Sequence, residues 1–403
     1  MSASVTDCDI AVIGAGIVGL GVAHAARRRG LDVIVVDRCD DIVGASVRNF
    51  GHACIGAQTG EAARYASLAR PLWLELARDA GFWLRACGSV VAARHEDEVA
   101  VLEAARAQDA NGIRMQTASE VRDHAPVGTS SLLGGALLQD DLQTDPRSAA
   151  HAIARLLARR GVEFRMRTSA LRLVSDAVSG GVRVQTTRGA VIARHAFVAV
   201  NHDLDQLLPD LAESEGVQRC ALDMMRVQAD LAAPLRTPVL TGWSLARYSR
   251  FADLPQARTM RQRLHQERPD LAAVDVNQMY TQLPDGTLFV GDTHTVSTAP
   301  GPFQAEAAQE LLLQETAELF GVPRPTVLER WQGVYAKGVD EFLRREVAPG
   351  VVALAATTGI GMTCGLGLAE DAVARALGER TAPTGSTTSP SPTQKTDHED
   401  YTS

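Results

Sequence analysis

The chain has 403 residues, of which 45% are hydrophobic, so it is long enough to bury a large core arranged as two lobes. Its net charge of −8 and its lack of a basic block argue against nucleic acid as the main partner. No apolar run approaches the length of a membrane-spanning helix, and the first residues lack a signal-peptide pattern. The 6 cysteines show neither a CxxC pair nor metal-ligand spacing. We therefore expect a cytoplasmic protein with free thiols, no membrane span and no metal site, and we leave its oligomeric state open.

The stretch from Cys8 to Asp37 predicts a dinucleotide-binding site. An apolar, unalternating strand at Ile10–Ile13 precedes a glycine turn, a helix that ends near Arg29, and a second strand at Val33–Val36. In the turn, Gly14 permits the tight bend, Gly16 lets a pyrophosphate approach the backbone, and Gly19 lets the helix lie close to the strand. The amides of Ile17 and Val18 begin the helix and would face the pyrophosphate. Asp37 follows the second strand, where an acid would bind ribose hydroxyls, and Arg38 comes next.

The segment from Gly44 to Ala53 is a loop rich in glycine and small polar residues. Beside a nucleotide site, such a loop suits the pyrophosphate and ring of a flavin, and the candidate contacts are Ser46, Arg48, Asn49, Gly51 and His52. An ordinary surface loop explains the same composition equally well.

Further elements follow in chain order. We expect helices at 61–80, 97–111 and 119–126, and strands at 89–93 and 132–138. Asp145 as N-cap with Pro146 at the first helical position starts a helix that runs to Arg160. Strands are expected at 162–166, 170–174, 182–186 and 190–200, and Ala170, Leu171 and Asn201 are added to the candidate cofactor contacts.

The second half of the chain changes character. Antiparallel strands are expected at 224–229, 279–283 and 287–290, followed by a helix at 303–320. A buried strand at 351–355 then enters a second glycine turn, Gly359-Ile360-Gly361-Met362-Thr363, before a final helix at 368–377. This turn would bring a helix N-terminus to the negative charge on a reduced flavin ring, which favours FAD over a nicotinamide. The Ser/Thr/Pro-rich tail at 381–403 is expected to be disordered.

Together the opening motif, the Ser46/Arg48/Gly51 loop, the Asp145-Pro146 helix start and the closing glycine turn resemble the D-amino-acid oxidase superfamily, which includes glycine oxidase and sarcosine oxidase. The resemblance covers about residues 8–380. It implies an α/β fold: a discontinuous Rossmann-like FAD-binding domain (1–88, 143–217 and 327–380) with an inserted, mainly antiparallel β-sheet substrate domain (89–142 and 218–326). More narrowly, 45–52, Gln58 and 331–335 are similar to a bacterial subgroup linked to aminophosphonate breakdown.

Three departures from the family pattern bear on the chemistry. Asp37 stands where members commonly carry Glu, and either acid can bind the ribose. Sarcosine oxidases attach flavin through a cysteine in the segment that here reads Gly333-Val334-Tyr335-Ala336, so we expect noncovalent FAD. Glycine oxidase and D-amino-acid oxidase place a carboxylate-binding arginine in that segment, where this chain has Tyr335, which argues against an ordinary α-amino acid as substrate.

Four residues are candidates for substrate contact or catalysis: Arg48, His52, Tyr335 and Lys337. The chain has only two lysines, and Lys337, the one outside the tail, occupies the segment that anchors the substrate in relatives. Structural or solvated roles for all four stay open, and Trp243, Tyr248, His294 and Trp331 are further residues that would line a pocket.

The resulting hypothesis is FAD-dependent oxidation of a small primary or secondary amine, with an aminophosphonate as one form of it, to an imine or aldehyde. Electrons would pass to O2 or another acceptor. The alternatives are a 2-hydroxy acid or D-amino acid dehydrogenase and, outside catalysis, a flavin-binding subunit that needs a partner chain.

Overall fold

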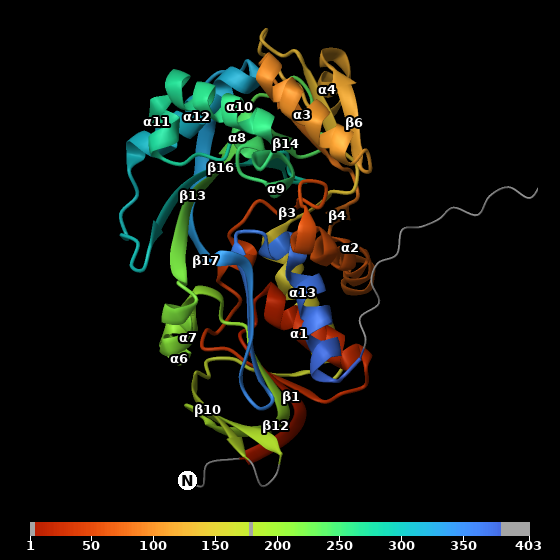
Figure 1. Cartoon of the computed structure of the whole chain (residues 1–403), viewed down its shortest axis with the longest axis vertical. Helices are drawn as coiled ribbons and strands as arrows, with labels where there is room; N and C mark the ends of the chain where they lie inside the picture. The colour runs from red at the N-terminus through yellow and green to blue at the C-terminus, as the bar shows by residue number, and fades with distance from the viewer. Residues whose placement is uncertain (1–4, 177–179, 380–403) are drawn as a thin grey trace, which may run out of the picture.

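The computed structural model describes residues 5–176 and 180–379, so the tail at 381–403 lies outside the described residues. The half of the molecule that is lower in Figure 1, where β1 and β12 are labelled, is built on a parallel sheet in the order β9-β2-β1-β12-β18. The strands are β1 (Val5–Ile13), β2 (Val33–Val36), β9 (Glu163–Arg165), β12 (Gly189–Val198) and β18 (Val351–Thr358).

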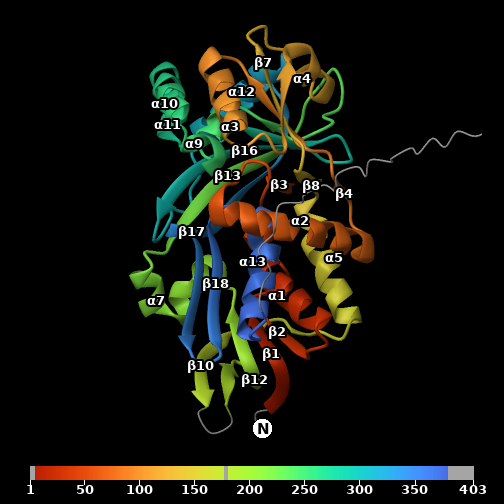
Figure 2. The ribbon, with the colours of Figure 1, turned by 45° about the vertical axis from the view of Figure 1, so that its right-hand side comes forward.

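Both faces of this sheet are covered. Four helices lie on one side of it, α1 (Ile17–Arg28), α2 (Gly60–Ala80), α5 (Pro146–Arg159) and α13 (Gly361–Ala376), as Figure 2 shows. The hairpin of β10 (Ala170–Asp176) and β11 (Gly181–Thr186) extends the sheet through β12, and α6 (Leu204–Leu207) and α7 (Pro209–Ser214) follow β12. Ile10 and Val12 pack into the helical core, whereas Ala11 and Ile13 pack into the core of the other face. Burial on both faces explains why this strand is apolar without alternation, as predicted.

The upper half is a mainly antiparallel sheet that roofs the parallel one. Its strands run β6-β7-β5-β14-β15-β16-β13-β17. They are β5 (Ser89–Ala93), β6 (Ile113–Thr117), β7 (Gly134–Leu138), β13 (Gln218–Gln228), β14 (Val239–Leu240), β15 (Met279–Gln282), β16 (Leu288–Ser297) and β17 (Thr326–Ala348). The helices are α3 (Glu96–Gln108), α4 (Ala118–His124), α8 (Gly242–Leu245), α9 (Ser249–Ala252), α10 (Pro255–Glu267), α11 (Pro269–Ala273) and α12 (Glu306–Phe320).

Strand β17 joins the two halves, and the sequence analysis did not predict it. Residues 326–337 pair with β13 in the upper sheet, and residues 337–348 pair with β18 beside the parallel sheet. The domain boundary expected after residue 326 therefore falls at the start of a strand that both halves share. The fold is nevertheless of the predicted class, an α/β fold in which a parallel Rossmann-like sheet is joined to a mainly antiparallel sheet.

Two other local predictions need correction. The last helix, α13, begins at Gly361 and not at Leu368. Glycine is a poor helix former, so the glycines of its first turns hid the helix in the sequence, although packing requires one of them. A Cβ on Gly367 would lie 2.0 Å from the carbonyl oxygen of Tyr65 in α2, so only glycine lets the two helices approach this closely. The helices α8, α9 and α11 were also missed, because with 4, 4 and 5 residues they are too short to show a helical period. The 13-residue helix α10 was missed as well, although its buried residues Ala257, Met260 and Leu264 follow helical spacing. Within the described residues, no helix is long and apolar enough to cross a membrane.

Candidate functional site

The first glycine turn is shaped by close backbone contacts. Gly14 has φ +106°, and a Cβ there would lie 2.5 Å from the carbonyl oxygen of Ala199. A Cβ on Gly19 would lie 1.9 Å from the carbonyl oxygen of Gly14. At Gly16, by contrast, an added Cβ would meet only the Ser46 hydroxyl, at 3.2 Å. Gly16 therefore faces open space, as a phosphate-binding glycine requires.

Two polar side chains brace this turn. Asp37 accepts hydrogen bonds from the amides of Ala15 at 2.7 Å and Cys39 at 2.8 Å, so its carboxylate shapes the loop as well as facing the nucleotide space. The hydroxyl of Ser46 accepts from the amide of Ile17 at 2.8 Å. The loop that follows β2 is thereby tied to the N-terminus of α1.

Three adjoining cavities, which share lining residues, lie between this turn and the upper sheet. The outer cavity is lined among others by Gly14, Gly16, Asp37, Arg38, Ser46, Arg48, Ala170, Leu171 and Asn201. The central cavity is lined among others by Gly16, Ile17, Val18, Ser46, Arg48, Asn49, Asn201, Tyr335, Gly359, Gly361 and Met362. The upper cavity is lined among others by Asn49, His52, Tyr335, Lys337, Gly359, Ile360, Met362 and Thr363. Nearly every predicted cofactor contact thus borders one of these adjoining cavities.

Gly19 and Gly51 are the two predicted cofactor contacts that line none of these three cavities. Gly19 serves helix packing, as its contact with Gly14 shows. Gly51 has φ +67°, and a Cβ there would lie 1.9 Å from the carbonyl oxygen of Thr144. Its position is therefore set by a tight contact with the strand at Thr144 and not by the cavities.

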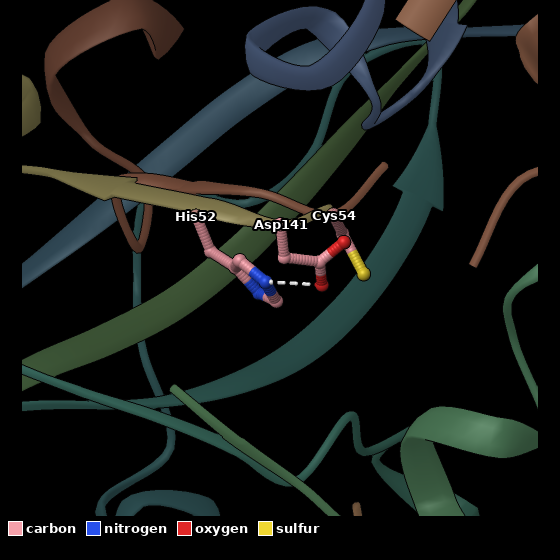
Figure 3. A group of neighbouring side chains, drawn as sticks. All are labelled: His52, Cys54 and Asp141. Carbon is pink, nitrogen blue, oxygen red and sulfur yellow. Dashed lines mark hydrogen bonds and ion pairs between the residues drawn. The ribbon is translucent and has the colours of Figure 1, made fainter. Parts of the chain in front are cut away.

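His52 lies in the wall of the upper cavity within a buried hydrogen-bonded group. It belongs to β3 (His52–Ala53), which forms a small sheet with β8 (Leu142–Thr144) and β4 (Leu84–Arg85). Its Nε2 lies 2.9 Å from the carboxylate of Asp141, and Cys54 lies on the other side of that carboxylate (Figure 3). Asp141 also accepts from the hydroxyl of Ser89 at 2.5 Å and from the amide of Gly56 at 2.6 Å.

The donor atoms of His52, Cys54 and Asp141 all lie within 4.8 Å of one another, close enough for a metal ion. Both oxygens of Asp141 are already hydrogen-bonded, and burial, followed by the charge of Asp141, raises the pKa of the Cys54 thiol well above its usual value. A protonated thiol is a poor metal ligand. The group is therefore better explained as a hydrogen-bonded support that fixes the His52 ring at the cavity wall.

His52, Tyr335 and Lys337 line the same cavity, the upper one, and Arg48 does not. Tyr335 and Lys337 are alternate residues of β17 that line the upper cavity, and burial raises the pKa of Tyr335, so it remains a phenol. The Lys337 ammonium makes no hydrogen bond or ion pair with another described residue, although its backbone pairs with β13 and β18. Arg48 borders only the central and outer cavities, and its Nη1 donates to the carbonyl oxygen of Gln332 at 3.1 Å.

Several charged residues of the upper cavity were missed. They are Arg247, Arg261, Asp253, Asp275, Asp292 and Glu341, and they lie beside the anticipated Trp243, Tyr248 and His294. The alternation of β16, in which Asp292, His294 and Val296 face the cavity, was a usable signal beyond the predicted end of that strand. Arg247 lies between two four-residue helices, where no periodic pattern marks it. Trp331 does not line the cavities; it packs edge-on against Phe289 and beneath Arg147.

The residues present fit FAD. The outer and central cavities extend from the β1–α1 glycine turn, with its inward-facing Gly16, to the N-terminus of α13 at Gly361. The two helix N-termini would face the pyrophosphate and the flavin ring. Among the described residues, no cysteine borders the central cavity.

Comparisons with known proteins agree with this arrangement. Solved structures with similar folds include glycine oxidase from Geobacillus kaustophilus, with TM-score 0.74 and 18% identity over 94% of this chain and 96% of that chain. L-proline dehydrogenase from P. horikoshii has TM-score 0.76 and 16% identity over 94% and 96%. Iminodiacetate oxidase from Chelativorans sp. BNC1 has TM-score 0.71 and 18% identity over 93% and 97%. At these identities the likeness establishes the fold alone, and no curated protein sequence matches the chain.

The family comparison goes further than the fold. The model of the DAO family, described as FAD dependent oxidoreductase, matches residues 9–375. This match spans the first glycine turn, the braced loop, β17 and the second glycine turn. The chain therefore belongs to the DAO family of FAD-dependent oxidoreductases, and FAD is its cofactor.

Proposed function

We propose that this enzyme oxidises a small amine that carries an acidic group, by FAD-dependent oxidative deamination to an imine that hydrolyses to an aldehyde. The observation that carries the proposal is the upper cavity, which adjoins the central cavity and has three cations, Arg247, Arg261 and Lys337, in its wall. The solved structures named above include proteins titled as acting on glycine, proline and iminodiacetate, all small molecules with an amine and a carboxylate. Bound FAD would supply the hydride acceptor.

The side chains of the upper cavity would hold and orient this substrate. The phenol of Tyr335 lies where the central and upper cavities meet, beside Gly359, whose added Cβ would lie 3.0 Å from the Tyr335 ring. Phe50, Leu222 and Met224 add apolar surface that excludes water from the same space. Thr363 accepts a hydrogen bond from the amide of Cys54 at 3.0 Å, which braces the loop carrying His52 against α13.

Arg247 is better placed than Arg48 to bind the acidic group. Its Nη1 donates to the carboxylate of Asp275 at 2.8 Å, which fixes the guanidinium while leaving Nε and Nη2 without a hydrogen-bond partner among the described residues. Arg261 also borders the cavity, but its Nη2 is turned to the backbone oxygens of Ala246 and Ala252. Free guanidinium donors in the same cavity wall as the Lys337 ammonium suit an anion with several oxygens.

We further propose that the acidic group is a phosphonate. The two segments that resemble the aminophosphonate subgroup, 45–52 and 331–335, contact each other beside the central cavity. Arg48 donates to the carbonyl oxygen of Gln332, and a Cβ on Gly333 would lie 2.8 Å from the carbonyl oxygen of Arg48. The two segments that carry the resemblance therefore lie together beside the central cavity, which supports the proposal.

A small aminophosphonate such as aminomethylphosphonate should exceed glycine in kcat/KM by at least about a hundredfold, or roughly 2.7 kcal/mol. A phosphonate offers three acceptor oxygens and more negative charge to Arg247 and Lys337, whereas a carboxylate offers only two oxygens and a single charge. Steady-state kinetics with both substrates checks this. Lys337→Ala should reduce the preference mainly by raising KM. Equal kcat/KM values for both substrates, in wild type and in Lys337→Ala, would reject the phosphonate.

The proposed reaction is tested by anaerobic flavin bleaching with a panel of small amines, D-amino acids and 2-hydroxy acids. Bleaching by amines with release of ammonia supports oxidative deamination. Bleaching by hydroxy acids alone would assign the alternative dehydrogenase. Protein that holds FAD but is reduced by no member of the panel would indicate a flavin-binding subunit that depends on a partner chain.

Acid precipitation of the protein should release intact FAD, giving a yellow supernatant and a colourless pellet. The physical reason is that the thiols of Cys54 and Cys364 are buried with raised pKa, and neither borders the central cavity. Absorbance of the two fractions and the mass of the protein check this. A protein mass increased by that of FAD would contradict it.

A further inference from the structure

Asp292 is a buried acid in the wall of the upper cavity. Binding and orienting an acidic substrate gives this carboxylate no role. It is 4% exposed and lies at a bulge in β16, because Gly291 pairs with Met224 and Thr293 pairs with Asp223. Its backbone bonds instead to Asn277, with N–O distances of 2.7 and 2.8 Å. A bulge re-aims the side chain of the extra residue, here onto the wall of the upper cavity.

His294, two residues along the same strand, has its proton fixed on one nitrogen. Its Nδ1 lies 2.9 Å from the carbonyl oxygen of Asp275, and a carbonyl oxygen can only accept, so Nδ1 carries the hydrogen. Burial, and then the charge of Arg247, lowers the pKa of His294 to about 3, so the ring is neutral and Nε2 has a free lone pair. That Nε2 lies 3.5 Å from Oδ2 of Asp292. An ionised Asp292 would face another acceptor, whereas a protonated Asp292 could donate to it.

The other surroundings of Asp292 leave it able to gain or lose a proton. Its Oδ1 has no hydrogen-bond partner among the described residues. Arg247 favours the charged form but makes no ion pair with it within 4.0 Å, and burial prevails, raising the pKa of Asp292 to about 7. The titratable groups that face Asp292 are His294 on its own strand, Arg247 and Tyr248 after α8, Asp275 before β15, Cys220 on β13 and Tyr335 on β17.

Resting on the proposed amine oxidation, we propose that Asp292 is the proton acceptor for the ammonium group of the substrate. An ammonium nitrogen has no lone pair, so the carbon beside it cannot release a hydride until a proton is lost. The N–H bond breaks and an O–H bond forms on the carboxylate, which turns an ammonium and a carboxylate into a neutral amine and a neutral acid. No electrons enter or leave in this step. The new O–H donates to Nε2 of His294, a positioning residue that holds the proton away from the amine.

The test is the pH dependence of the second-order rate constant for anaerobic flavin reduction by amines of different pKa, such as glycine, sarcosine and aminomethylphosphonate. In wild type, the rate should rise with a midpoint near the pKa of Asp292, about 7, for every amine, and fall again at the pKa of each amine. In Asp292→Asn the rise in rate near pH 7 should disappear, and the rate should instead increase to a plateau above the pKa of the amine. The expected loss near pH 8 is about a hundredfold.

Asp230→Asn is the matched control, because Asp230 is an exposed acid that borders none of the three cavities. It should keep the wild-type profile. In wild type, a rise in rate whose midpoint follows the pKa of each amine would overturn the role of Asp292 and leave amine oxidation intact. This outcome does not depend on whether Asp292→Asn folds. An unchanged profile in a folded, FAD-loaded Asp292→Asn would do the same. Failure of every amine to reduce wild type at any pH would overturn the proposed function itself and the inference with it.

Discussion

Replacing Gly16 with valine should give a folded protein that retains less than about a tenth of the FAD held by wild type. Gly16 borders both the outer and the central cavity, and its added Cβ would meet only the Ser46 hydroxyl, at 3.2 Å. The branched side chain would therefore project into the space of the pyrophosphate with little cost to the fold. The ratio of flavin to protein absorbance after purification measures the loss, and circular dichroism measures folding.

Gly301→Val is the matched control for this substitution. Gly301 is exposed, has ordinary φ, and has no atom within 4 Å of an added Cβ. It should bind FAD at the wild-type ratio. Full FAD retention in Gly16→Val would mean that the pyrophosphate lies elsewhere, and the assignment of the first glycine turn would fall.

Arg247→Met should raise KM for an acid-bearing amine by about a hundredfold, with a smaller change in kcat. Arg247 lies in the wall of the upper cavity, where its Nη1 donates to Asp275 and its Nε and Nη2 have no partner among the described residues. Loss of a charge-assisted, poorly hydrated pair costs roughly 2 to 3 kcal/mol, which corresponds to that factor. Methionine keeps most of the apolar stem, so packing changes little.

Two comparisons separate this effect from a general loss of charge. Arg258→Met removes an exposed arginine of α10 that does not border the cavity and should leave KM unchanged. An amine without an acidic group should show the same KM in wild type and in Arg247→Met. A KM for the acid-bearing amine that stays within about threefold of wild type in Arg247→Met would exclude the guanidinium as the anion site.

Predictions from the sequence succeeded where neighbouring residues carry the signal. The glycine turn after β1, the Asp145-Pro146 start of α5, whose Asp145 side chain accepts from the amide of Arg147, and the buried parallel strands all depend on local geometry. The prediction for α13 was wrong because Gly365 and Gly367 discourage a helix locally, while the contact of Gly367 with the Tyr65 backbone requires a glycine within the helix. β17 was not predicted because its two halves pair with different sheets, so its burial does not alternate regularly along the strand.

The sequence by itself determined the cofactor class and predicted its binding segments, because a phosphate-binding turn needs glycines, a helix start and an acid at short, fixed spacing. It also predicted Arg48, His52, Tyr335 and Lys337 as candidates for substrate contact or catalysis. Only the tertiary structure decided which charges share the upper cavity. Arg247 follows a short helix, Asp275 precedes β15, and Asp292 and His294 lie on β16, and they meet only because the sheet pairs β16, β13 and β17 side by side. Burial in that shared cavity, and not the identity of any neighbour in the chain, gives Asp292 a pKa of about 7.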